Sequence, residues 1–128
     1  MTTLLLDTHV ALWMVGSPER LGMNARAAID RGDNNVLVSV ASVWEASIKV
    51  ALGKLVAPPT VWDEVERSGV RIVAIERVDA VAAAALPAHH RDPFDRMLIA
   101  QAVERGAVLV TADRWANAYD VRVLPATL

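Results

Sequence analysis

The sequence predicts an α/β domain, a three-layer α/β/α sandwich built around a mostly parallel sheet. Short, almost wholly apolar runs alternate along the chain with longer segments of helical character. Continuous apolar strands of this kind are typical of parallel sheets that helices cover on both faces. The length of 128 residues, 54% of them hydrophobic, suits one core. We therefore expect a single domain over residues 1–128.

The first elements follow from local composition. Leu4–Leu6 predicts a short buried strand, and Val10–Met14 predicts the helix after it, which Gly16-Ser17-Pro18 ends. A second helix is expected over 24–31. The segment Val36–Val38, with two β-branched residues, predicts the next strand.

The middle of the chain continues the alternation. A helix with a broad apolar stripe is expected over 41–52, and Gly53 ends it. Pro58-Pro59 opens a further helix that runs to Arg67. The segment 70–75 is rich in β-branched residues and predicts a strand.

The last part of the chain contains the clearest helix. An alanine-rich helix is expected over 79–86. The next helix, over 93–105, has Asp92 as its N-cap, proline at its first position and glycine just beyond its end. Strands over 108–110 and 121–124 complete the prediction.

Four acidic residues each lie near the place where a predicted strand gives way to a helix: Asp7, Glu45, Asp95 and Asp113. Functional groups in open α/β sheets gather at the carboxyl ends of the strands, so we expect these side chains to converge. Four carboxylates in one place repel each other unless a cation lies between them. Mg²⁺ and Mn²⁺ prefer such oxygen ligands, and the pattern therefore suggests a metal-dependent phosphodiesterase.

Each acid also has a purely structural interpretation. Asp7 and Asp113 can cap the turns that follow them. Ser42 and Glu45 have capping-box spacing, and Asp95 faces the positive end of its helix dipole. Composition alone leaves the metal site and these structural roles both open.

Four blocks of the sequence resemble the PIN-domain ribonucleases, and among them the VapC-type toxins of bacterial toxin–antitoxin systems. The blocks are LLLDTH (4–9), SVWEASIK (42–49), HRDPFDRMLIAQA (90–102) and LVTAD (109–113). The resemblance runs along the whole chain and implies an Mg²⁺- or Mn²⁺-dependent endoribonuclease. It assigns the catalytic and metal-binding positions to Asp7, Glu45, Asp95 and Asp113, and a supporting hydroxyl to Thr111.

In such an enzyme the acids would hold one or two divalent ions that activate water for attack on RNA. Asp7 and Asp95 are the expected direct ligands. Thr8 and Asp92 are candidates for support of the carboxylates. Three arginines flank the acids and are candidate phosphate contacts, with solvated charges as the alternative: Arg91, Arg96 and Arg114.

Other notable side chains are given ordinary roles. Lys49 is expected to pair with Glu45 one turn earlier. No serine or cysteine motif accompanies the histidines, so we expect surface or packing roles for His9, His89 and His90. Core or dimer contacts are expected for the tryptophans on apolar helix faces: Trp13, Trp44 and Trp62.

The resemblance also implies a VapB-type antitoxin that enters the acidic cleft, an RNA substrate and a homodimer. The chain has no cysteine, which fits a reducing cytoplasm. Neither a signal peptide nor a membrane span is expected, because the N-terminus lacks basic residues and no apolar run approaches roughly 20 residues. The net charge of −2 does not by itself indicate nucleic-acid binding.

Two alternatives from other classes remain. One is an inactive RNA-binding domain that retains the fold. The other is a Mg²⁺-binding receiver-like signalling domain, which would need an aspartate at the end of its central strand and a lysine at the end of its last strand. Ser39 and Arg122 occupy the corresponding regions, which disfavours the receiver.

Overall fold

The computed structural model describes residues 1–127. Its centre is a five-stranded sheet of β1 (Thr3–Leu6), β2 (Asn35–Ser39), β3 (Arg71–Val73), β4 (Val108–Thr111) and β5 (Val123–Pro125). The strand order is β3-β2-β1-β4-β5, and every neighbouring pair is parallel. The predicted fold class is confirmed.

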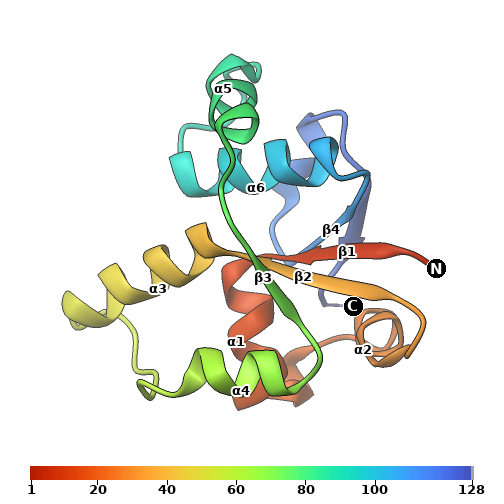
Figure 1. Ribbon diagram of the computed structural model, residues 1–128, viewed down its shortest axis with the longest axis vertical. Coiled ribbons are helices and arrows are strands. Elements are labelled where there is room, and N and C mark those ends of the chain that lie inside the picture. Colours follow the sequence, from red (N-terminus) through yellow and green to blue (C-terminus); the bar gives the residue numbers. More distant parts are fainter. Residues whose placement is uncertain (128) are drawn as a thin grey trace.

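Helices cover both faces of the sheet. They are α1 (Thr8–Gly16), α2 (Met23–Asp30), α3 (Val40–Ala51), α4 (Val61–Arg67), α5 (Arg77–Ala85) and α6 (Pro93–Glu104), with the 3₁₀ turns η1 (Pro18–Arg20) and η2 (Arg114–Ala118). Figure 1 shows α5 and α6 on one side of the strands and α1, α2 and α4 on the other. Within the described chain, no helix is both long and apolar enough to cross a membrane.

Two apolar clusters form the core, one on each face of the sheet. Leu6 packs with Val10 of α1 and Val65 of α4, whereas Leu5 packs with Ile99 of α6. Successive side chains of a strand point to opposite faces, and here helices cover both faces. This double burial explains why the strands are continuous apolar runs instead of alternating patterns.

The order of the strands reverses beside β1. The chain builds β2 and β3 on one side of β1, and then places β4 and β5 on the other side. In open α/β sheets, a crevice forms at such a reversal, outside the carboxyl ends of the strands. Asp7 directly follows β1 and Asp113 comes two residues after β4. The topology therefore brings acids from opposite ends of the sequence to one edge.

Some element ends differ from the prediction. The strand expected over 70–75 ends at Val73, because the Ala74 carbonyl accepts a hydrogen bond from the Gln101 side chain at 3.2 Å instead of extending the sheet. The α5 helix begins at Arg77, before the predicted start, because Glu76 and Asp79 form a capping box.

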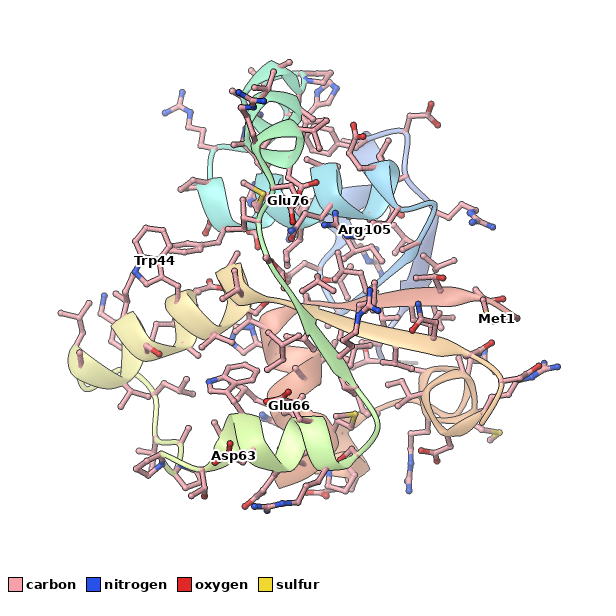
Figure 2. All side chains as sticks on the ribbon, in the orientation of Figure 1. Met1, Trp44, Asp63, Glu66, Glu76 and Arg105 are labelled. Atoms are coloured by element: carbon pink, nitrogen blue, oxygen red, sulfur yellow. The ribbon has the colours of Figure 1, made fainter. Side chains whose placement is uncertain are left out.

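Two further differences concern the last strand and a tryptophan. The last strand starts late, at Val123, after a turn in which the Val121 amide donates to the Tyr119 carbonyl. Trp44 is 62% exposed and so is not a core residue. Its ring meets Phe94 edge-on with 5.2 Å between ring centroids, and it projects from α3 at the rim of the molecule (Figure 2).

Candidate active site

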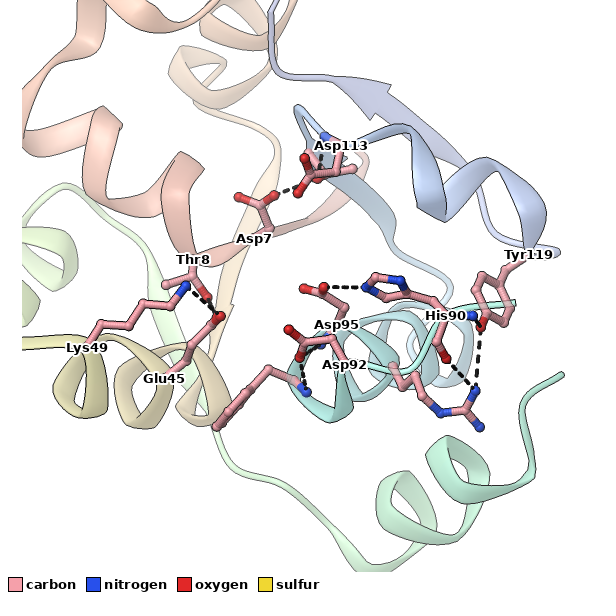
Figure 3. A network of polar contacts seen from close by, with 12 residues as sticks. Asp7, Thr8, Glu45, Lys49, His90, Asp92, Asp95, Asp113 and Tyr119 are labelled. Atoms are coloured by element: carbon pink, nitrogen blue, oxygen red, sulfur yellow. Dashed lines mark hydrogen bonds and ion pairs between the residues drawn. The ribbon is translucent and has the colours of Figure 1, made fainter. Parts of the chain in front are cut away.

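A hollow of about 190 Å³ lies at the reversal point of the sheet. Its lining is acidic, with five carboxylates against one lysine, and the four acids predicted from the sequence all belong to it. The lining residues are Asp7, Thr8, His9, Glu45, Lys49, Asp92, Asp95 and Asp113. Figure 3 shows the carboxylates of α3, α6 and the ends of β1 and β4 around one space.

Asp7 is buried at the junction of β1 and α1. Its Oδ1 atom accepts a hydrogen bond from the Val10 amide at 2.8 Å, which caps α1 as the structural interpretation expects. Its Oδ2 atom accepts a hydrogen bond from the Thr111 hydroxyl at 2.5 Å. Burial raises the pKa of Asp7, and the charge of Asp113 adds to this rise, while the hydrogen bonds from Thr111 and Val10 oppose it. Capping and a place in the hollow are therefore compatible.

Glu45 lies on α3 with only 8% of its surface exposed. The Thr8 hydroxyl donates to its Oε1 atom at 2.6 Å, and the Lys49 ammonium lies 3.1 Å from its Oε2 atom. The predicted pairing of Glu45 with Lys49 is confirmed. Both carboxylate oxygens of Glu45 are thus held by neighbouring side chains.

The capping-box interpretation of Glu45 is wrong. The N-cap of α3 is Ser39, whose hydroxyl accepts a hydrogen bond from the Ala41 amide at 3.0 Å. Ser42 lies inside the helix, and its hydroxyl is 3.0 Å from that of Thr8. Ser42 therefore helps to fix the threonine that holds Glu45.

Asp95 lies in the first turn of α6. Asp92 is the N-cap of this helix, as predicted, and accepts hydrogen bonds from the amides of Phe94 at 2.9 Å and Asp95 at 3.3 Å. The element before α6 is the helix α5, so Asp95 does not lie where a strand gives way to a helix, and the predicted pattern is wrong at this residue. Burial raises the pKa of Asp95 to about 6, and the charges of Asp92 and Glu45 contribute to the rise.

His90 is a site residue that the sequence did not identify as one. Its Nε2 atom lies 2.7 Å from Oδ2 of Asp95, and this hydrogen bond opposes the rise in the pKa of Asp95. The imidazole stacks on Trp115 with 4.7 Å between ring centroids and 8° between ring planes. The His90 amide also donates to the Tyr119 hydroxyl at 2.9 Å. The predicted packing role is therefore correct but incomplete.

Asp113 is the most open of the four acids. Its backbone amide donates to the Thr111 hydroxyl oxygen at 3.1 Å, so Thr111 connects it with Asp7. Asp113 precedes η2, but its side chain makes no capping hydrogen bond, so the capping interpretation is not supported. Figure 3 shows its carboxylate beside that of Asp7.

The three arginines proposed as phosphate contacts lie in different environments. The Arg96 guanidinium donates to the carbonyl oxygens of Leu86 at 2.8 Å and of Ala83 and Pro87 at 2.9 Å. Arg96 thus holds the end of α5 and the following loop, which is a different role from the predicted one. Arg91 and Arg114 are exposed.

The oxygen-rich lining suits a hard divalent cation in its chemistry. Burial is the largest cause of the raised pKa values of Asp7 and Asp95, and the charges of neighbouring carboxylates add to both rises. Within residues 1–127, no three acidic or histidine side chains gather closely enough to hold an ion together. In this arrangement Thr111 contacts a carboxylate oxygen of Asp7, Lys49 one of Glu45 and His90 one of Asp95. An ion would compete with these contacts for the same oxygens.

Comparison with known proteins gives one consistent result. The chain matches the PIN domain family over residues 4–121. It is 38% identical over 118 residues to Ribonuclease VapC22 of Mycobacterium tuberculosis, with 89% of each chain covered.

Solved structures share the fold at low sequence identity. A chain of DNA-bound VapBC from Salmonella typhimurium matches with a TM-score of 0.72 at 18% identity over 98% of both chains. A chain of VapBC2 from Rickettsia felis, bound to a promoter DNA fragment, also gives 0.72, at 12% identity over 97% of this chain and 98% of that one. The family match leaves the receiver-like alternative without support. The chain belongs to the PIN-domain family and, within it, is a VapC-type protein.

Proposed function

We propose that this chain is a metal-dependent endoribonuclease that acts as the toxin of a toxin–antitoxin pair. Its catalytic acids in this proposal are Asp7, Glu45, Asp95 and Asp113. The observation that carries the proposal is their placement around one hollow, in a chain 38% identical to a protein named a ribonuclease.

Mg²⁺ or Mn²⁺ is the proposed cofactor. Asp7 and Asp95 are the proposed direct ligands because they are buried or half-buried and their pKa values are raised. Glu45 and Asp113 would complete the oxygen ligands from the other walls of the hollow. A bound divalent ion supplies positive charge that makes water more acidic and stabilises the leaving oxygen.

The chain's own residues hold these carboxylates in place. Thr111 fixes Asp7, Thr8 and Lys49 fix Glu45, and His90 fixes Asp95. Such contacts orient the acids and reduce the reorganisation needed when substrate binds. Because water is the proposed nucleophile, the RNA 2′-hydroxyl is not used, and the products carry 5′-phosphate and 3′-hydroxyl ends.

A VapB-type antitoxin is the proposed protein partner. Among the solved structures with the same fold are two VapBC assemblies bound to DNA. A basic side chain from the partner would compensate the acidic hollow and compete with a metal ion for its oxygens. We further propose a homodimer that acts on RNA in the cytoplasm.

Cleavage of end-labelled total RNA tests the nuclease directly. Purified protein is incubated with EDTA, Mg²⁺ or Mn²⁺, beside the variants Asp7→Asn and Asp95→Asn. We expect cutting only with metal and a loss of at least about 100-fold in both variants, because each removes a charged oxygen from the hollow. Asp63→Asn is the matched control, since Asp63 is exposed on α4 and does not line the acidic hollow.

Three results would contradict parts of this proposal. Equal cutting by all variants would remove the acids from the reaction. Products with 2′,3′-cyclic phosphate would exclude water as the nucleophile. RNA binding without cutting under any metal condition would favour an inactive RNA-binding domain.

A further inference from the structure

A second hollow adjoins the acidic one. It has a volume of about 420 Å³ and lies between the start of α2, the end of β5 and η2. Thr111 and Asp113 belong to its lining, and Asp113 also lines the acidic hollow. The two spaces therefore share a wall at the carboxyl end of β4.

The second hollow has a different chemistry from the first. Its lining includes the polar residues Asn24, Asn117 and Arg114, with Asp113 as its one acidic residue. Asn24, Arg114 and Asn117 are exposed. None of these three side chains forms a hydrogen bond or ion pair within residues 1–127, so their polar groups remain available to a ligand.

The remaining wall is the open edge of the sheet. β5 is an edge strand, and it bonds to β4 through the Arg122 carbonyl and the Ala126 amide at 2.9 Å each. Alternate residues of a strand bond to the same side. The backbone of Val123, which directly follows Arg122, therefore faces away from β4. The Val123 and Leu124 side chains add apolar surface to this wall.

We propose that the second hollow binds one nucleotide of single-stranded RNA next to the scissile phosphate, with Asn24 and Asn117 contacting its base and Arg114 its phosphate. This assignment rests on the proposed nuclease function. The volume falls within the range of about 300–1,000 Å³ that is typical of small-ligand sites. Asparagine amides carry both donors and acceptors, which match the edges of an unpaired base.

The shared wall makes RNA the favoured occupant over a protein segment. RNA is a continuous polymer, so a strand whose phosphate lies among the acids must leave the hollow over one of its walls. At Asp113 the acidic hollow borders the second hollow, whose lining includes two asparagines and an arginine. Guanidinium groups suit phosphate contacts, and asparagine amides suit base contacts.

Mapping of cut sites in a pool of unstructured RNAs with randomised sequence tests this assignment. Both fragments are sequenced after limited cutting by wild type, Asn24→Ala, Asn117→Ala and Arg114→Ala with Mn²⁺. We expect the asparagine variants to lose base preference at one position beside the cut. We expect all three to raise KM about three- to tenfold, with kcat changed less, because each removes a substrate contact. Asn35→Ala is the matched control, since Asn35 begins β2 at its amino end, whereas both hollows lie at the carboxyl ends of the strands.

The outcomes separate this inference from the nuclease proposal. No metal-dependent cutting by wild type would contradict the nuclease itself, and the nucleotide site with it. Cutting by wild type with the same base preference in Asn24→Ala, Asn117→Ala and Asn35→Ala would overturn the nucleotide site alone. The nucleotide site is also overturned if an added VapB-type antitoxin no longer inhibits the variants while their cut sites stay as in wild type. The second hollow would then bind protein. Thermal unfolding of each variant identifies any that fail to fold, and Asn24→Ser, Asn117→Ser or Arg114→Gln then replaces the affected variant at the same position.

Discussion

The Nε2 atom of His90 lies 2.7 Å from Oδ2 of Asp95, and the imidazole is stacked on Trp115. The loop before α6 is thereby connected to the acidic hollow through one side chain. Tyr119 fixes the same loop from the C-terminal part of the chain, because its hydroxyl accepts a hydrogen bond from the His90 amide. The position of the Asp95 carboxylate thus depends on residues that lie outside the hollow.

Replacement of His90 by alanine is expected to lower RNA cleavage about tenfold, because Asp95 loses the contact that orients it. The hydrogen bond from His90 opposes the rise in the pKa of Asp95, so its loss raises that pKa further. Since metal ions bind deprotonated carboxylates, Mn²⁺ binding should then require a higher pH. Calorimetric titration of wild type and variant with Mn²⁺, at several pH values between about 5.5 and 8, measures this shift.

His89→Ala is the control for that experiment. The His89 ring packs against Tyr119 with 5.1 Å between centroids and does not line the acidic hollow. An equal loss of Mn²⁺ binding in both variants would show that loop packing, not the contact with Asp95, is responsible.

Asp95→Asn is expected to make the metal-free protein more stable at neutral pH. The pKa of Asp95 is about 6 in the folded chain against its usual 3.8, so the folded state binds more protons between these values. The free energy of unfolding therefore falls as the pH rises through this window. Asparagine removes the cost of the buried charge. Thermal unfolding in EDTA should show a gain at pH 7.5 that shrinks towards pH 4.

Asp63→Asn serves again as the control, because Asp63 is exposed on α4. A stability gain of the same size in this variant would mean that net charge, and not the crowded site, determines the effect. A lower melting temperature for Asp95→Asn would contradict the prediction outright.

Thr111→Val is expected to weaken Mn²⁺ binding, and more strongly at low pH than at high pH. The hydroxyl donates to Asp7 and lowers its pKa against the effect of burial, so its removal raises the pKa of Asp7. The change also leaves the Asp113 amide without its acceptor. Thr111→Ser retains the hydroxyl and should restore binding. Failure of serine to restore it would assign the effect to packing of the methyl group.

Arg96→Ala is expected to destabilise the fold by about 2 kcal/mol, because several carbonyl oxygens lose a charged donor. Those of Leu86 and Pro87 are among them. Arg96→Lys should recover little of this loss, since an ammonium group cannot reproduce the fork of donors. Urea unfolding measures both variants, with the exposed Arg91→Ala as control. Full stability in Arg96→Ala would show that solvent satisfies these carbonyls equally well.

The fold was largely predictable because its strands are buried on both faces. Leu4–Leu6 and Val108–Val110 are apolar throughout, so the strand pattern is not obscured by alternating polar residues. Asp7 and Asp113 were predictable as neighbours because strand ends meet at one edge of a parallel sheet.

The surroundings of Asp95 were not predictable in the same way. His90 reaches Asp95 because Trp115 and Tyr119 hold its loop, and both lie far along the chain from it. Local sequence patterns contain no information about such contacts. The role of Arg96 was missed for the same reason, because its acceptors are backbone carbonyls that have no sequence signature.

The pairing of β1 with β4 has a consequence for how the protein is made. A ribosome synthesises Asp7 long before Asp113, because the two acids lie far apart in the sequence. While the chain is growing, β1 can pair with β2, but it lacks β4 and the Thr111 hydroxyl until those residues have also emerged. A chain that has not yet reached β4 therefore holds Asp7 and Glu45 without Asp113. The cell that produces the protein meets an assembled site only after β4 has been synthesised and has paired with β1.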